Sequence, residues 1–159
     1  MKGAQRMVTR AERNATDPDL GVLAGRLLFA VQRELFTELA ARGFDDLNHR
    51  HGAVLAYLDP GGVRATELSR LSGQHKQIIG TLVDELEALG YVHRRPDPRD
   101  RRAKLVCPTD RGLAQLRASD TIMANLQQRH ARRLGRADYD RFKQLFADIT
   151  EHQRRHIGS

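Results

Sequence analysis

Two short amphipathic segments joined by a glycine, with a cluster of arginines directly after them, constrain the fold of this chain most. "ATELSRLSG" predicts a helix of about two turns that ends at Gly73, and "HKQIIGTLVDELEALG" predicts a second helix that Gly90 ends. The second helix places its apolar residues on one face: Ile78, Ile79, Leu82, Val83, Leu86 and Leu89. Two short helices joined by a tight glycine-containing turn form a helix-turn-helix.

The segment "RRPDPRDRRAKLVCPTDRG" then concentrates positive charge at one place. "YVHRRPDP" and "AKLVCPT" are typical of two short strands on either side of "RDRR". The basic residues here are Arg94, Arg95, Arg99, Arg101, Arg102 and Lys104. A helix-turn-helix followed by a basic hairpin is a winged helix, whose second helix enters the major groove of DNA while the hairpin contacts the backbone or the minor groove. Phosphates would neutralise the arginines; a solvated charged loop is the alternative.

Two aspartates inside this arginine cluster predict an ordered hairpin tip. Asp97 and Asp100 can accept hydrogen bonds from arginine side chains or from turn amides. Such bonds would hold the tip in shape and direct one guanidinium outward.

The polar face of the second helix carries side chains that suit base edges. It offers Gln74, His75, Lys76, Gln77, Gly80, Thr81 and Asp84. Gln suits adenine, whereas Lys suits guanine or phosphate. Gly80 costs about 1 kcal/mol relative to Ala in mid-helix. Either the backbone approaches the DNA groove closely at Gly80, or the glycine packs tightly against another helix, and both explanations stay open.

Amphipathic helices flank the predicted winged helix on both sides. Asp17 and Pro18 suit the start of a helix that ends near Gly43, and a shorter helix is expected from Asn48 to "DPGG". Two further helices follow the hairpin, and their apolar stripes include Leu113, Leu116, Met123, Leu126, Leu134, Tyr139, Phe142, Leu145, Phe146 and Ile149. A helix of about 25 residues is roughly 38 Å long, longer than a winged-helix lobe is wide. A second chain is therefore expected to cover these stripes, with Leu126 in the dimer contact.

These observations predict a mainly α chain: a winged helix-turn-helix with a small β-hairpin, plus an N- and C-terminal helical dimerisation region. The expected parts are a flexible arm (1–18), a dimerisation helix (19–46), the winged helix-turn-helix lobe (47–109) and C-terminal dimerisation helices (110–159).

The charge balance narrows the possible partners. A net charge of +7 and a pI near 10.3 favour a polyanionic partner, either nucleic acid or an anionic membrane. None of the predicted helices has the large apolar anchors of a membrane-surface helix, and no segment approaches a spanning run of about 20 apolar residues. The chain also lacks the apolar segment of a signal peptide, so we expect a cytoplasmic protein without a membrane partner.

Other chemistry is weakly supported. Cys107 is the only cysteine, and burial as a small hydrophobe is favoured over a redox switch. His152 and His156 share a helical face, and His49 and His51 lie at another helix start, but neither pair has a cysteine or carboxylate cluster beside it. No phosphate loop, dinucleotide fingerprint, zinc-protease motif or nucleophile elbow occurs, so we expect neither an enzyme nor a cofactor nor a metal.

From "ATELSRLSG" to "CPTDRG" the chain resembles the MarR family (multiple antibiotic resistance regulators). The most specific part is Asp97-x-Arg99-Asp100-x-Arg102, followed by Leu105, Thr109 and Gly112. The resemblance covers roughly residues 19–156. It implies a homodimer whose first and last helices intertwine on a pseudo-palindromic operator. It also implies that Arg102 enters the minor groove, oriented by Asp100, with Arg99 and Arg101 on or beside phosphates.

The resulting candidates for DNA contact are His75, Lys76, Gln77, Gly80, Thr81, Arg95, Arg99, Asp100, Arg101, Arg102 and Lys104. Thr81 and Glu85 depart from the family, which often has basic residues there. The resemblance also implies a repressor relieved by a small aromatic or anionic effector between the dimer helices and the lobe, with Arg50 and His51 as weak candidates for touching it. The alternatives are a redox- or metal-responsive regulator of the same fold and a non-specific nucleic-acid-binding protein.

Overall fold

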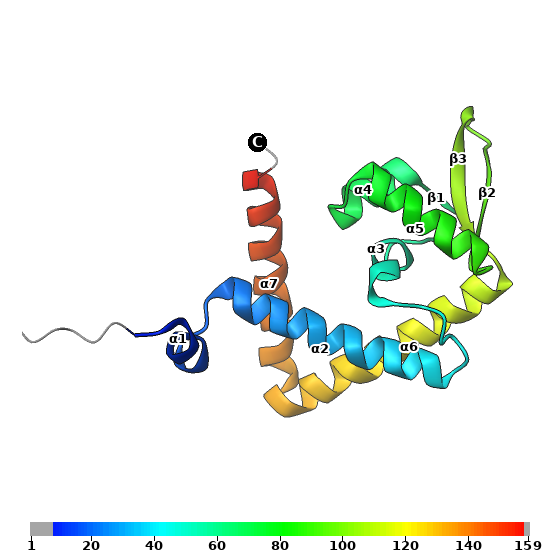
Figure 1. The fold of residues 1–159 in the computed structure, drawn as a ribbon. Coiled ribbons are helices and arrows are strands. Elements are labelled where there is room, and N and C mark those ends of the chain that lie inside the picture. Colours follow the sequence, from blue (N-terminus) through cyan, green and yellow to red (C-terminus); the bar gives the residue numbers. More distant parts are fainter. Residues whose placement is uncertain (1–7, 158–159) are drawn as a thin grey trace, which may run out of the picture.

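The computed structural model describes residues 8–157. In chain order its elements are α1 (Arg10–Thr16), α2 (Leu20–Ala41), the 3-10 turn η1 (His49–His51), α3 (Gly52–Leu55), β1 (Val63–Arg64), α4 (Ala65–Ser72), α5 (Lys76–Ala88), β2 (Val92–Asp97), β3 (Asp100–Pro108), α6 (Asp110–Leu134) and α7 (Arg136–Ile157). The protein is mainly helical with one small antiparallel sheet, which confirms the predicted fold class. The winged lobe, η1 to β3, lies to one side of the long helices α2, α6 and α7 (Figure 1).

The helix-turn-helix forms where the sequence predicted it. Gly73 ends α4 with φ +72, a left-handed conformation that glycine adopts without strain, and α5 begins three residues later. The Ser69 hydroxyl donates to the carbonyl of Gln74 at 2.6 Å, which closes the turn. The two helices therefore pack at a fixed angle.

The apolar face of α5 supplies much of the core of the lobe. Ile79, Leu82, Val83 and Leu86 are buried together with Leu68 of α4. Ile78 was predicted on the same face, but 41% of it is exposed. Ile78 is rotated by about 100° around the helix axis from the buried Ile79, so it lies at the edge of the apolar stripe. There it lines the cavity described below.

The sheet has the strand order β1-β3-β2. The hairpin pairs Val92 with Pro108 at its base, and the register shifts between Pro96 and Asp97 near its tip. Only two residues turn the chain, because β3 already starts at Asp100. The sequence had placed all of "RDRR" between the strands, whereas the structure puts residues 100–102 inside β3.

The N-terminal arm, predicted to be flexible over residues 1–18, contains the helix α1. The Thr9 hydroxyl accepts from the amide of Glu12 at 3.2 Å, and the Glu12 carboxylate accepts from the amide of Thr9 at 2.8 Å. This reciprocal capping satisfies two amides that a helix start otherwise leaves unpaired. Residues 1–7 of the predicted arm lie outside the described residues.

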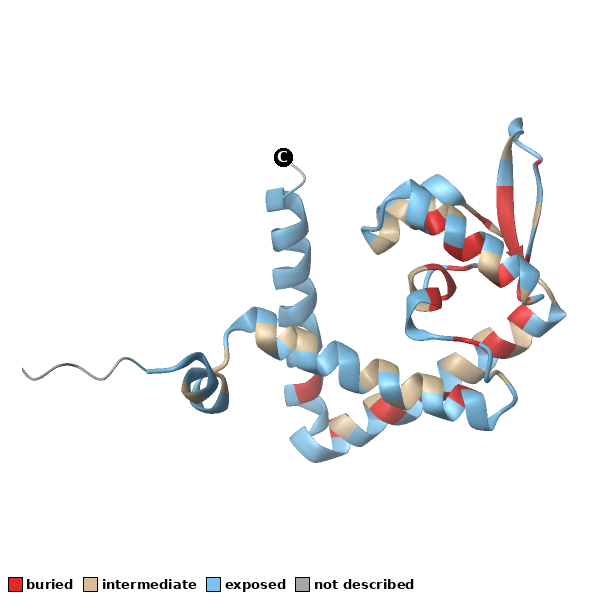
Figure 2. Ribbon diagram, in the orientation of Figure 1, coloured by how far each residue is buried: buried red, intermediate tan, exposed pale blue. Residues whose placement is uncertain are grey.

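The long helices leave much apolar surface uncovered. α7 is exposed over most of its length, as is the N-terminal half of α2 (Figure 2). The exposed large side chains of these two helices include Leu20, Leu23, Leu27, Leu28, Phe29, Phe142, Leu145, Phe146 and Ile149. Leu126 of α6, which was predicted in the dimer contact, is instead only 5% exposed within one protomer, so the expectation for this residue was wrong.

Candidate nucleic-acid interface

The start of α5 is exposed along the face expected to contact DNA. His75 is the residue that precedes the helix, and Lys76 and Gln77 form its first turn; all three are exposed. Thr81 is also exposed, and its hydroxyl donates to the carbonyl of Gln77 at 3.2 Å. The structure thus brings these four candidates together on one accessible helix face.

Gly80 lies on this face, one turn along α5. Among the described residues, no atom beyond the helix's own backbone lies within 4 Å of the position that a β-carbon would take. Tight packing against another helix, one of the two explanations left open by the sequence, therefore has no support within the protomer. Close approach of another molecule to the backbone is the explanation that stays.

Asp97 organises the tip of the hairpin. Its side chain is fully buried and accepts hydrogen bonds from Nε of Arg64 at 2.7 Å and from the amide of Arg99 at 2.9 Å. The Arg99 amide, followed by the Arg64 side chain, holds the pKa of the Asp97 carboxyl below its ordinary value. The predicted role of this aspartate in ordering the tip is consistent with these contacts.

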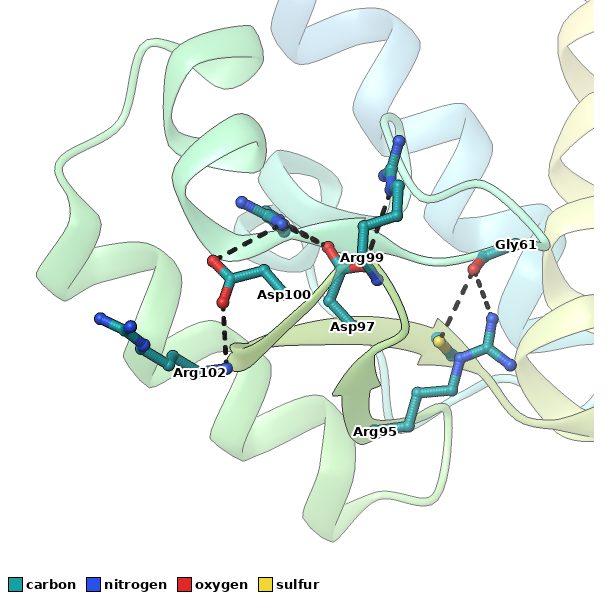
Figure 3. A network of polar contacts seen from close by, with 8 residues as sticks. Gly61, Arg95, Asp97, Arg99, Asp100 and Arg102 are labelled. Carbon is teal, nitrogen blue, oxygen red and sulfur yellow. Dashed lines mark hydrogen bonds and ion pairs between the residues drawn. The ribbon is translucent and has the colours of Figure 1, made fainter.

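Asp100 acts on the backbone of the strand. Its Oδ1 accepts from the amide of Arg102 at 3.1 Å, while the guanidinium of Arg102 extends away from the carboxylate (Figure 3). The resemblance implied that Asp100 orients Arg102. In the structure it fixes the main chain from which Arg102 projects, and no contact between the two side chains is present among the described residues.

The basic side chains of the outer hairpin differ in their contacts with the rest of the protein. Arg99, Arg101, Arg102 and Lys104 are exposed, and Arg99 is 83% exposed although its Nε lies 3.6 Å from Asp97. Arg95 is exposed as well, but its Nη2 donates to the carbonyl of Gly61 at 2.8 Å (Figure 3). The outer part of the hairpin therefore keeps most of its positive charge available to a partner.

The acidic partners of Arg94 offset part of the positive charge that is concentrated in the hairpin. Its guanidinium pairs with both Asp84 and Glu87 of α5, and its amide donates to Glu87 at 3.0 Å. Burial opposes a raised pKa for Arg94, but the hydrogen bonds that its guanidinium donates to Asp84 and Glu87 raise the pKa nevertheless. The contacts also fasten β2 to the end of α5.

Sequence reasoning missed Arg64 and the acidic partners of Arg94. Arg64 and Asp97 are 33 residues apart, and no local pattern marks Arg64 as a partner of the wing. Its position immediately before a predicted helix-turn-helix and its positive charge were the only signals available.

A cavity of about 1290 Å³ lies between the winged lobe and the long helices. Its walls come mostly from α2, α3 and α6, and Arg50 and Gln115 are among its polar lining residues. His51 is not part of the wall: it is buried in the lobe, where Nε2 lies 3.1 Å from Glu85 and Nδ1 accepts from the Asn48 amide at 3.1 Å. Of the two effector candidates, the structure places Arg50 at the cavity.

The remaining reactive side chains do not gather into a second site. Cys107 is buried, with Sγ 3.9 Å from the carbonyl of Gly61. Within residues 8–157, no group of three or more histidines, cysteines or carboxylates is arranged to hold a metal ion. In the same range, every helix is too short or too polar to cross a bilayer.

The exposed second helix of the helix-turn-helix and the arginine-tipped hairpin beside it define a winged-helix protein. Residues 45–103 match the model of the MarR family. This segment covers most of the winged-helix lobe of the chain, which is therefore similar to the MarR family, as its sequence indicated. Among curated proteins, none matches the chain.

Solved structures of this fold extend the similarity to the long helices. CouR from Rhodococcus jostii RHA1, bound to p-coumaroyl-CoA, is 26% identical with a TM-score of 0.68, over 82% of this chain and 91% of that chain. The transcriptional repressor CouR bound to a 23-mer DNA duplex is 25% identical with a TM-score of 0.68, over 87% and 96%. The transcriptional regulator PcaV from Streptomyces coelicolor, with its natural ligand, is 26% identical with a TM-score of 0.66, over 87% and 94%.

Proposed function

We propose that this protein is a cytoplasmic transcriptional regulator that binds double-stranded DNA as a homodimer. The observation that carries the proposal is the placement of an accessible helix start and an exposed cluster of arginines on the same winged lobe. A helix of this kind fits the major groove, and arginines fit phosphates and the narrow minor groove. The similar repressor CouR has been solved on a DNA duplex, which supports the proposal.

We assign the DNA contacts to two elements. His75, Lys76, Gln77 and Thr81 of α5 face base edges or the phosphates beside them, and Gly80 lets the backbone approach the groove. Arg99, Arg101, Arg102 and Lys104 of the hairpin contact the backbone and the minor groove. Arg95, whose guanidinium is held by Gly61, contributes less, and Asp100 acts by shaping the strand.

The homodimer is supported by the exposed apolar faces of α2 and α7. Phe29 and Leu28 on α2 and Phe142, Leu145 and Ile149 on α7 are large side chains that one protomer leaves in water. Exposed apolar surface on this scale is typical of a protein interface. Pairing through these helices would place two α5 helices about one DNA turn apart, as a pseudo-palindromic site requires.

We further propose a repressor whose DNA affinity falls when a small molecule occupies the cavity. A largely apolar cavity with a few polar groups is typical of a small-molecule site, and it lies between the dimerisation helices and the winged lobe. A ligand that favours one arrangement of these two parts shifts the population away from the other. Structures of CouR and PcaV with ligands support this part of the proposal, and we assign the protein no catalytic role.

The proposal can be tested with a duplex that the full-length protein selects from a random-sequence pool. We expect the dimer to bind it much more tightly than a scrambled duplex, with an affinity that falls steeply as salt rises because counterions are released. Equal affinity for both duplexes would indicate a non-specific nucleic-acid-binding protein. No binding to either duplex at low salt would contradict the proposal.

A further inference from the structure

Arg64 connects the two DNA-facing parts of the winged lobe. Its backbone forms β1 and immediately precedes α4, the first helix of the helix-turn-helix. Its side chain reaches the tip of the hairpin, where Nε and Nη2 lie 2.7 and 2.6 Å from Oδ2 of Asp97. Nη2 also lies 4.0 Å from Oδ2 of Asp100. One guanidinium therefore faces both aspartates of the arginine-rich tip.

These two aspartates hold the main chain from which the exposed arginines project. Oδ1 of Asp97 accepts the amide of Arg99, and Oδ1 of Asp100 accepts the amide of Arg102. Each carboxylate uses one oxygen toward Arg64 and the other toward the backbone of the tip. A continuous series of contacts thus connects β1, through the two carboxylates, to the segment that carries Arg99 and Arg102.

The tip has few other means of keeping its shape. The ladder between β2 and β3 shifts register between Pro96 and Asp97, next to the turn. Asp97 is fully buried, and a buried carboxylate is stable only when it is paired and hydrogen-bonded. Arg64 supplies that pairing from outside the hairpin, so its removal would leave the carboxylate with the Arg99 contacts alone.

We propose that Arg64 is a positioning residue of the DNA-binding surface, which orders the wing tip through Asp97 and so aims Arg99 and Arg102. This inference deepens the proposed function and rests on it. Arg64 acts on DNA through the hairpin and not by touching phosphate. If Arg64 were lost, DNA binding would have to order the tip, and fixing the backbone of a single residue costs a factor of roughly ten in affinity. We therefore expect a loss of DNA affinity of that size.

The first experiment uses the full-length protein without DNA. In Arg64→Gln, we expect the heteronuclear NOE of the Arg99 amide to fall toward values of a mobile loop, while amides of α5 keep theirs. Asp97→Asn should lower the same NOE, since it removes the other half of the contact. Arg136→Gln is the matched control, because Arg136 is an exposed arginine on α7 that loses the same charge. An unchanged Arg99 NOE in both wing variants would overturn the proposal.

The second experiment measures affinity for the duplex that the wild-type protein selects. Arg64→Gln should weaken binding by roughly tenfold, and Arg136→Gln should leave it unchanged. The double variant Arg64→Gln, Asp97→Asn should bind no more weakly than Arg64→Gln, because both changes break one contact. Losses that add in the double variant would show that Arg64 contacts DNA itself, and the proposal would fail.

Arg64→Lys separates charge from geometry. Lysine keeps the positive charge but has a single nitrogen, so it cannot reproduce the contact that Nε and Nη2 of Arg64 make together with Asp97. Relative to Arg64→Gln, we expect Arg64→Lys to regain DNA affinity only to the extent that the NOE of the Arg99 amide also returns. Full affinity together with a mobile tip would contradict the positioning role. If the wild-type protein bound no duplex, the proposed function would fail, whereas the NOE measurements would still decide whether Arg64 orders the tip.

Discussion

A β-carbon on Gly62 would overlap Sγ of Cys107, and it would also lie 3.2 Å from Cβ of Leu105. The loop before β1 therefore lies directly on β3, with no room for a side chain between them. The neighbouring carbonyl of Gly61 accepts from Nη2 of Arg95 at 2.8 Å. The same loop contributes Asp59 and Pro60 to the cavity wall, so it touches both the cavity and the wing.

Gly62→Ala should destabilise the protein by about 1–3 kcal/mol, because Gly62 has φ +92 and its β-carbon would meet Cys107. Gly61→Ala is the matched control, since no atom of the described residues lies within 4 Å of its β-carbon position and its φ is not positive. Urea unfolding of both variants measures the difference. Equal midpoints for the two would contradict the close contact.

Gly80→Ala should separate stability from DNA binding. Alanine in mid-helix stabilises by about 0.5–1 kcal/mol relative to glycine, and the position is open within the described protomer. If the backbone approaches DNA here, affinity for the selected duplex should fall although the melting temperature rises. A variant that is more stable and binds DNA unchanged would remove Gly80 from the interface.

Arg102→Ala should weaken binding to the selected duplex by about 1–3 kcal/mol while leaving the fold intact, because the side chain is exposed and contacts DNA in the proposed complex. Fluorescence anisotropy measures the affinity, and the melting temperature checks the fold. Arg136→Ala, which removes an equal charge far from the wing, serves as the control. Undiminished binding by Arg102→Ala would exclude insertion of this side chain into the minor groove.

Leu145→Glu should dissociate the homodimer without unfolding the protomer. Leu145 on α7 is 51% exposed, so a charge there is tolerated in the monomer but not inside an apolar interface. Light scattering after size exclusion gives the mass, and DNA affinity should fall with it. Leu126→Glu should instead lower the melting temperature, because Leu126 is buried within the protomer. A dimer that persists in Leu145→Glu would place the interface elsewhere.

Asp97 should titrate below its ordinary pKa of 3.8, since the Arg99 amide and the Arg64 side chain stabilise the carboxylate in the folded protein. The lowered pKa means that the carboxylate stabilises the fold above about pH 4, and this contribution is lost as the pH falls through the lowered value. The side-chain carboxyl carbon followed by NMR measures the midpoint. Arg64→Gln should raise it, and a wild-type midpoint at or above 3.8 would contradict the pairing.

Local patterns predicted the winged helix well, because the residues that begin and end its helices and strands lie within those segments. Gly73 marks the end of α4, the apolar spacing marks α5, and the alternation of Arg and Asp marks the hairpin tip. The family resemblance rests on the same short stretch and is confirmed by the match over residues 45–103. Ile78 shows the limit of spacing alone, because burial depends on where the neighbouring helix lies.

Several contacts that shape the site escaped prediction, because they join different elements of the fold. The sequence groups Arg94 with the basic residues of the hairpin and indicates no partner for it, yet Asp84 and Glu87 of α5 pair with it. His51 was expected near an effector, yet Glu85 and the Asn48 amide hold it in the lobe. The partners of a charged side chain depend on the tertiary fold, which a pattern along one segment does not specify.

The contacts of Arg94 with Asp84 and Glu87 bear on how a protein of this kind would dissociate from DNA. Because this guanidinium connects β2 to the last turns of α5, we expect the hairpin and the groove-facing helix to move together. In the proposed function, a small molecule in the cavity that changed the tilt of this lobe would therefore displace both DNA-contacting elements of each protomer at the same time.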